Sequence, residues 1–225
     1  MEKLELVKKL IIFDLDGTLI DSADQIYTAV CLTRDKLHYA QAPKEILTPR
    51  IGLAAEELFF DLDLSHAELV KAVEILRTHI SLLKLSELDL FPNVKELLGL
   101  LISKDYLLAI GTNKPFRLAD KALTECQIRE SFSLVIGGDS LPLKPDKAII
   151  ESCLNYFHIP TTSAIMIGDR LEDICAASSA RVTSYGVLQG VHNQDQLIES
   201  GAKKVFLGIT DLYDSLVRGW DFGDL

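Results

Sequence analysis

Six short apolar runs recur along this chain, and they restrict the fold more than any other feature. Most of them carry apolar residues at successive positions, so both faces of the strands they form must be buried. The stretches between the later runs show apolar residues at helical spacing instead. This alternation predicts an α/β core, a doubly wound parallel (Rossmann-like) sheet with helices on both faces. The runs start at Lys9, Leu107, Leu134, Ala164, Val182 and Lys204.

The interval 21–88 differs from the rest because it contains no convincing strand. A capping-box pattern begins it at Ser22, and a second lies at Ser65 to Glu68, each followed by apolar residues at helical spacing. We therefore predict an all-helical cap domain over 21–88. It is inserted into an α/β core made of 1–20 and 89–225. Within that core, Pro115 and Pro145 are each expected to open a helix.

Composition restricts the partners and the compartment. A formal net charge of −10 argues against nucleic acid or an anionic membrane surface, since both require clustered cations. The four cysteines show no Cys-x-x-Cys spacing, which fits buried thiols in a reducing compartment. Residues 1–13 mix acids into a short apolar run, which predicts neither a signal peptide nor a membrane span. We expect a cytoplasmic monomer or homodimer with no nucleic-acid or membrane partner.

Polar side chains follow four of the expected strands. Asp14 and Asp16 stand one residue apart after the first strand, and carboxylates this close repel each other unless a cation lies opposite them. Ligands of open parallel sheets bind outside the carboxyl ends of the strands, so these side chains are expected to meet at one edge. The other polar residues at these ends are Thr112, Asn113, Lys144, Asp169 and Asp173.

Each of these features has an ordinary structural explanation by itself. An Asp-x-Asp after a strand is commonly a turn, and Asp169 with Asp173 fits the first turn of a solvated helix. Thr112 and Asn113 could cap a helix, and Lys144 could be a surface lysine. Only their occurrence together, in this order at successive strand ends, favours a site.

Four segments carry a resemblance to a known family. FDLDGT from Phe13, GTN from Gly111, LKP from Leu143 and IGDRLED from Ile167 resemble the four motifs of the haloacid-dehalogenase-like (HAD) hydrolase superfamily. The resemblance covers nearly the whole chain, and 21–88 is similar to the cap of that family's first cap class. TNKP from Thr112 looks most like phosphoglycolate phosphatases.

The chain also departs from the family pattern at several positions. Asn93 and Arg181 stand where relatives usually carry glycine, and Arg170 stands where serine is common. Asparagine tolerates a positive φ better than most residues, so the turn at Asn93 can survive. Arg170 could reach toward the cap or the substrate, or lie in solvent.

The resemblance implies a role for each site residue. Asp14 would be the nucleophile that forms an aspartyl-phosphate, and Asp16 would protonate the leaving alkoxide and later accept a proton from water. Thr112 and Lys144 would bind the transferring phosphoryl group, with Asn113 as a supporting substrate contact.

The resemblance also implies a magnesium site. A carboxylate approaches a phosphate dianion only if charge is neutralised, and Mg²⁺ prefers oxygen ligands. The implied ligands are Asp14, the main-chain carbonyl of Asp16, and Asp169. Asp173 would orient Lys144 or a metal-bound water.

These roles predict a Mg²⁺-dependent phosphatase acting on a small phosphorylated metabolite, with 2-phosphoglycolate as the leading substrate. The acid at position 16 favours a phosphatase or a mutase over a dehalogenase. Arg50, within the cap, could pair with a substrate carboxylate or lie at the surface. Two alternatives stay open at this point: a phosphomutase resembling β-phosphoglucomutase, and a binding or regulatory protein of the same fold whose turnover is incidental.

Overall fold

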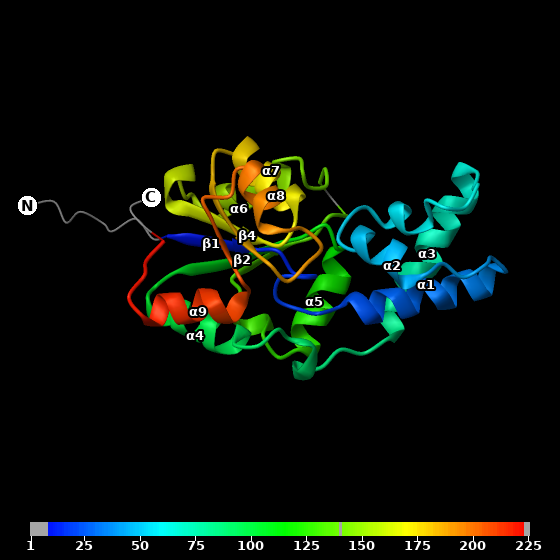
Figure 1. The fold of residues 1–225 in the computed structure, drawn as a ribbon, viewed down its shortest axis with the longest axis horizontal. Helices are drawn as coiled ribbons and strands as arrows, with labels where there is room; N and C mark the ends of the chain where they lie inside the picture. Colours follow the sequence, from blue (N-terminus) through cyan, green and yellow to red (C-terminus); the bar gives the residue numbers. More distant parts are fainter. Residues whose placement is uncertain (1–8, 140, 223–225) are drawn as a thin grey trace, which may run out of the picture.

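The computed structural model describes residues 9–139 and 141–222. Within them, six parallel strands form one sheet in the order β3-β2-β1-β4-β5-β6, which confirms the predicted doubly wound α/β core (Figure 1). Each of the six apolar runs forms one strand. The strands are β1 (Leu10–Phe13), β2 (Leu107–Gly111), β3 (Leu134–Ile136), β4 (Ala164–Gly168), β5 (Thr183–Val187) and β6 (Lys204–Phe206).

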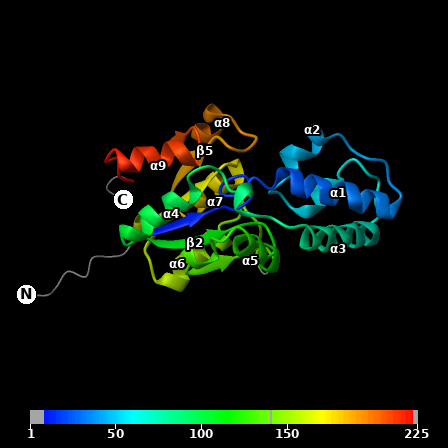
Figure 2. The ribbon, with the colours of Figure 1, turned by 90° about the horizontal axis from the view of Figure 1, so that it is seen from below.

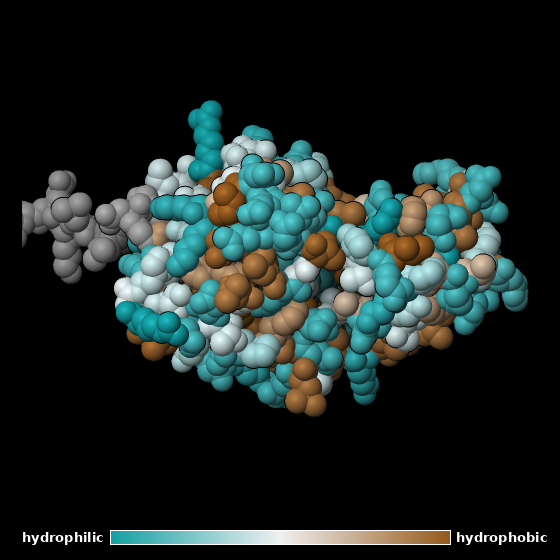
Figure 3. Space-filling view, in the orientation of Figure 1, coloured by the Kyte–Doolittle hydropathy of each residue, from teal (hydrophilic) through white to brown (hydrophobic). Residues whose placement is uncertain are grey.

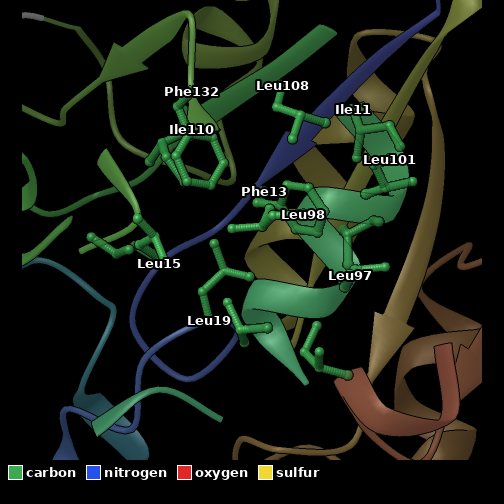
Figure 4. Packing of buried hydrophobic residues seen from close by; sticks show 14 of the residues in the cluster. Ile11, Phe13, Leu15, Leu19, Leu97, Leu98, Leu101, Leu108, Ile110 and Phe132 are labelled. Atoms are coloured by element: carbon green, nitrogen blue, oxygen red, sulfur yellow. The ribbon is translucent and has the colours of Figure 1, made fainter. Parts of the chain in front are cut away.

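Helices cover both faces of this sheet because the strands are apolar on both faces. Ile11 and Phe13 of β1 pack on one side, where Leu97, Leu98 and Leu101 of α4 face them (Figure 4). Their neighbours along β1 pack on the opposite side. The first side is covered by α4 (Val94–Ser103), α5 (Phe116–Glu125) and α9 (Ile209–Val217), and the second by α6 (Ala148–Phe157) and α7 (Leu171–Ser179). The short α8 (Gln194–Glu199) packs through Leu197 against Ile174 of α7.

A helical segment between β1 and α4 forms a separate lobe (Figures 1 and 2). Its hydrophobic cluster is its own, and Phe59 and Leu76 are buried at its centre. This agrees with an inserted cap, and the boundaries at 20/21 and 88/89 stay a prediction. The lobe contains α1 (Ala23–Leu37), α2 (Lys44–Leu47), α3 (His66–Leu82) and the 3₁₀ turns η1 (Thr48–Arg50) and η2 (Ala55–Phe59), and η3 (Glu87–Asp89) follows on the way back to the core.

The two connections between the lobes run side by side. Ile20 and Leu90 form an isolated antiparallel bridge, and the amide of Asp21 donates to the carbonyl of Asp89 at 2.8 Å. The chain therefore leaves and re-enters the core through two segments that are paired with each other.

Two of the expected helix starts differ in the structure. The box at Ser65 is confirmed, since Ser65 and Glu68 bond each other's amides. Ser22 lies at the N-cap of α1, but its side chain makes no capping bond and donates instead to Asp16. The helix that was expected to open at Pro145 starts later than expected.

That helix, α6, begins at Ala148 instead of directly after Pro145. The side chain of Asp146 accepts a bond from the Ala148 amide at 2.8 Å, so a turn comes before the helix.

An aromatic cluster packs against the sheet near β6. Phe222 is fully buried, its carbonyl accepts a bond from the Tyr185 hydroxyl at 2.7 Å, and the Trp220 ring meets Tyr185 edge to face.

Residues 223–225 lie outside the described residues, as do residues 1–8, over which the sequence predicts no leader or span. In the described part of the chain, no helix has both the length and the apolar character needed to cross a bilayer. Hydrophilic residues predominate on the face drawn in Figure 3, with smaller hydrophobic groups between them.

Candidate active site

Lys144 lies at the centre of the predicted site. Its Nζ donates to Oδ1 of Asp14 at 2.7 Å, to Oδ1 of Asp173 at 2.5 Å and to the carbonyl of Gly111 at 2.8 Å. Burial opposes its charge, but the two carboxylates outweigh burial and raise the pKa of Lys144. The lysine is therefore a fixed cation, and three segments distant in sequence meet around it.

The pairing of β1 with β4 explains why two of the acids are neighbours. Phe13 lies opposite Ile167 in register, so the residues that follow, Asp14 and Asp169, emerge together at the carboxyl edge. Oxygens of Asp14, Asp169 and Asp173 all lie within 4.8 Å of one another. Burial, followed by the charges of Asp14 and Asp173, raises the pKa of Asp169 well above its usual range. Burial and the neighbouring carboxylates thus both disfavour the ionised form of Asp169 unless a cation lies beside it.

The backbone approaches the carboxylate of Asp169 closely. A Cβ at Gly190 would lie 1.9 Å from its Oδ2, and one at Gly17 would lie 2.7 Å away. Gly17 also has a φ of +84°, which favours glycine. Thr18 donates to the other oxygen, Oδ1, at 2.6 Å. The loop after β1 and the loop after β5 therefore enclose this side chain.

Asp16 has a partner that the sequence analysis missed. Lys114 donates to Oδ1 of Asp16 at 2.8 Å and to Oδ2 at 3.0 Å, and Ser22 donates to Oδ1 at 2.5 Å. Both lysine and aspartate are buried. The available signal was the position of Lys114, two residues beyond Thr112 at the end of β2.

Thr112 and Asn113 also lie where the sequence predicts them. Thr112 is buried after β2, and its Oγ1 accepts a bond from the amide of Lys114 at 3.2 Å. The side chain of Asn113 accepts from the amide of Lys144 at 2.8 Å and donates to its carbonyl at 3.2 Å. It also donates to the carbonyl of Gly52 in the cap at 3.1 Å. Asn113 thus fixes the loop that carries the central lysine.

Arg50 is the predicted site residue that the structure does not bring to this cluster. Its guanidinium lies 3.4 Å from the centre of the Phe60 ring, and its Nη1 donates to the carbonyl of Ile46 at 3.2 Å. These contacts hold it within the cap, because an aromatic face and a helix-end carbonyl both attract a cation. A contact between Arg50 and a substrate stays a prediction, and the position of this side chain within the cap does not favour it.

A cavity of about 240 Å³ lies between the cap and the core. Asp16, Asn113 and Lys114 line it from the core, and apolar residues of the cap form much of the opposite wall together with Glu56 and Arg77. A second cavity of about 100 Å³ is also lined by Asp16, here together with Asp169 and Arg170 of the core. Space for a ligand therefore adjoins the carboxylates.

Comparison with known proteins agrees with this geometry. The family model described as haloacid dehalogenase-like hydrolase matches residues 11–187. Phosphoglycolate phosphatase from Psychrobacter arcticus is 31% identical over 224 residues, which cover 95% of this chain and 97% of that protein. The phosphoglycolate phosphatase of Haemophilus influenzae is 32% identical over 209 residues, covering 88% and 93%.

Solved structures give the same result. A structure from Haemophilus somnus, described as a predicted phosphoglycolate phosphatase, is 27% identical with a TM-score of 0.80, covering 94% of this chain and 97% of that one. A β-phosphoglucomutase-like structure from Thermotoga maritima, at 23% identity and a TM-score of 0.71, shares the fold.

The fold is that of a haloacid dehalogenase-like hydrolase, and the chain belongs to this family. Within the family it is a phosphoric monoester hydrolase, similar over nearly its whole length to phosphoglycolate phosphatases.

Proposed function

We propose that this protein is a Mg²⁺-dependent phosphatase that hydrolyses 2-phosphoglycolate through an aspartyl-phosphate on Asp14. The observation that supports the mechanism best is the position of Lys144, which joins Asp14 to Asp173 while Asp169 adds a third carboxylate within 4.8 Å. One lysine against three acids leaves the cluster short of positive charge. A divalent cation held by Asp14 and Asp169 would supply that charge.

The donor atoms fit a hard cation. Asp14 and Asp169 offer carboxylate oxygens at adjacent strand ends, and the main-chain carbonyl of Asp16 would complete the protein's share of the ligands. Both oxygens of Asp173 already accept bonds, one from Lys144 and one from the Arg170 amide at 3.2 Å, which suits a supporting role. When bound, Mg²⁺ neutralises charge on the phosphoryl oxygens.

In the first half of the proposed reaction, a carboxylate oxygen of Asp14 attacks phosphorus and the ester P–O bond breaks. Asp16, whose oxygens accept bonds from Lys114 in this structure, enters this step protonated and gives that proton to the leaving alkoxide. Lys144, a buried cation 2.7 Å from Asp14, and the hydroxyl of Thr112 stabilise the charge that builds on the phosphoryl oxygens.

In the second half, water attacks phosphorus and gives a proton to Asp16. The bond between phosphorus and the Asp14 oxygen breaks, which releases inorganic phosphate and restores both carboxyl groups. Splitting the displacement in two replaces one difficult step by two easier ones.

The choice of substrate rests on the relatives and on the cavity beside Asp16. Relatives about 31% identical over nearly the whole chain are phosphoglycolate phosphatases. Arg77 and Lys114 also line this cavity, but Glu56 lines it too and Lys114 is paired with Asp16, so the support for this substrate comes mainly from the relatives.

The test is phosphate release with Mg²⁺ over a panel of 2-phosphoglycolate, sugar phosphates, nucleotides and pyrophosphate. Asp14→Asn is the matched control. Acid-quenched protein should gain the mass of one phosphoryl group in the native chain and not in the variant. Selective turnover of 2-phosphoglycolate that is lost in Asp14→Asn supports the whole proposal.

Turnover of a different ester with the same dependence on Asp14 would retain the mechanism and replace the substrate. Interconversion of sugar phosphates without net phosphate release would favour the mutase. Tight binding of Mg²⁺ with no turnover on the panel would favour a binding or regulatory protein.

A further inference from the structure

Arg170 joins the core to the cap. Its Nη1 donates to the carbonyl of Ile51 at 2.7 Å and its Nη2 to the carbonyl of Pro49 at 3.0 Å, and the residue is only 4% exposed. These carbonyls lie at the C-terminal end of η1, where main-chain acceptors lack helical partners. A guanidinium from the core therefore binds two main-chain carbonyls at the end of this 3₁₀ turn of the cap domain.

The core side of this contact is equally well fixed. The Nε of Arg170 donates to Oε2 of Glu172 at 3.1 Å, and its main-chain amide donates to Asp173. Asp169 directly precedes it. Arg170, which bonds the cap, thus lies in the sequence between Asp169 and Asp173, two carboxylates of the site.

The contact also leaves little free space. A Cβ at Gly52 would lie 2.9 Å from Cδ of Arg170, and Gly52 has a φ of +93°. Ile51, Gly52 and Leu53 line the 240 Å³ cavity that Asp16 lines from the core. Arg170 therefore helps to fix the position of one cavity wall, together with Asn113, which donates to the carbonyl of Gly52 at 3.1 Å.

We propose that Arg170 is a positioning residue that holds the segment 49–53 of the cap over the active site and so places the wall that faces the leaving group. This rests on the proposed function in one respect: the cavity beside Asp16 is taken as the place of the leaving group. Loss of the contact lowers the fraction of molecules in which segment 49–53 lies where this structure places it. A ligand that needs this wall then binds more weakly by the same factor.

The first arm of the test compares Arg170→Ser and Arg170→Lys with the native enzyme, on whichever substrate it turns over. Arg170→Ser should raise KM about tenfold and leave kcat within about threefold, since hydrogen bonds from a charged donor are lost while the chemistry is untouched. Arg170→Lys keeps the charge and should recover part of the KM. Arg218→Ser is the matched control, because Arg218 is exposed and its side chain pairs, among the residues described, with its helix neighbour Asp214.

The second arm needs no substrate. Hydrogen–deuterium exchange of the native chain and of each variant should show faster exchange for amides of residues 50–55 in Arg170→Ser, by about tenfold or more. Amides of α3 around Leu76 should stay unchanged. If Arg170→Ser does not fold, Arg170→Lys should show the same changes to a smaller extent.

Unchanged exchange at 50–55, or a fall in kcat with KM unaltered, would overturn the proposal. An enzyme that hydrolyses no ester on the panel would contradict the proposed function, and the exchange measurement would still decide the role of Arg170.

Discussion

Lys114 donates to both carboxylate oxygens of Asp16, at 2.8 and 3.0 Å, and Ser22 donates to one of them from the N-cap of α1. The proposed acid and base is thus oriented by one residue of the core and one at the start of the cap. An acid that must deliver a proton at a defined point depends on such orientation.

Lys114→Met should lower kcat by about 10- to 100-fold, because Asp16 loses the donor that fixes its orientation. It should also lower the free energy of unfolding by about 3 kcal/mol, since a buried carboxylate is left without its ion-pair partner. Steady-state kinetics and urea unfolding measure the two effects. The double variant Lys114→Met/Asp16→Asn should regain part of the stability and none of the activity; a double variant as unstable as Lys114→Met would contradict the pairing.

Magnesium should stabilise the protein more at pH 7.5 than at pH 5. Burial raises the pKa of Asp173 to about 6 against the opposing charge of Lys144, and the pKa of Asp169 is also raised. An acid whose folded pKa exceeds its unfolded value of about 4 contributes stability that is complete below about pH 4. That stability is lost as the pH rises through about 6.

The metal-free protein should therefore lose stability over this window, and Mg²⁺ should restore it. At about 100 times its Kd, the ion should add about 2.7 kcal/mol. Thermal unfolding in EDTA and in Mg²⁺ at both pH values measures this difference. An equal gain at pH 5 would show that ionisation of the cluster is not linked to binding.

Gly190→Ala should weaken Mg²⁺ binding by about tenfold or more, because its Cβ would lie 1.9 Å from Oδ2 of Asp169 and must displace that carboxylate. Titration calorimetry measures the affinity. Gly99→Ala is the matched control: a Cβ there meets nothing within 4 Å in the interior of α4, so it should leave binding unchanged and add about 0.5–1 kcal/mol of stability. Equal Mg²⁺ affinity in the two variants would refute the close packing around Asp169.

Asp61→Asn should destabilise the cap by about 2 kcal/mol at pH 7, since Asp61 bonds the buried guanidinium of Arg34. The hydrogen bond from Arg34 lowers the pKa of Asp61. Its stabilisation is therefore present above about pH 4 and is lost as the pH falls through the lowered pKa. Urea unfolding from pH 7 down to pH 3 should show the difference in free energy of unfolding between native and variant chains falling toward zero. A constant difference would argue against the ion pair.

Arg181→Gly should raise the free energy of unfolding by about 1 kcal/mol. Arg181 is exposed and adopts a φ of +58°, a conformation that glycine reaches without the steric cost of a Cβ. Thermal unfolding measures the gain. A variant less stable than the native chain would mean that the arginine side chain makes a compensating contact.

The sequence predicts the sheet well because its strands are buried on both faces. Apolar residues at every position of β1 and β4 leave few other ways to bury them, and adjacency of these strands then brings Asp14 and Asp169 together. The left-handed backbone at Asn93, with a φ of +63°, follows from the same reasoning about turns.

Other features depend on competition between partners that are distant in sequence. The hydroxyl of Ser22 can cap its own helix or bond Asp16, and only the fold decides between them. The cationic side chains of Lys114 and Arg50 likewise find partners that local periodicity does not reveal, an aspartate for the first and the Phe60 ring for the second.

The paired connections at Ile20 and Leu90 have an evolutionary consequence. Because entry and exit lie next to each other, an insertion of almost any length closes between them without moving the strands that carry the carboxylates. The cap can be lost, lengthened or exchanged as a cassette while the chemistry beneath it is inherited intact. Selectivity and catalysis can then diverge at different rates in the same gene.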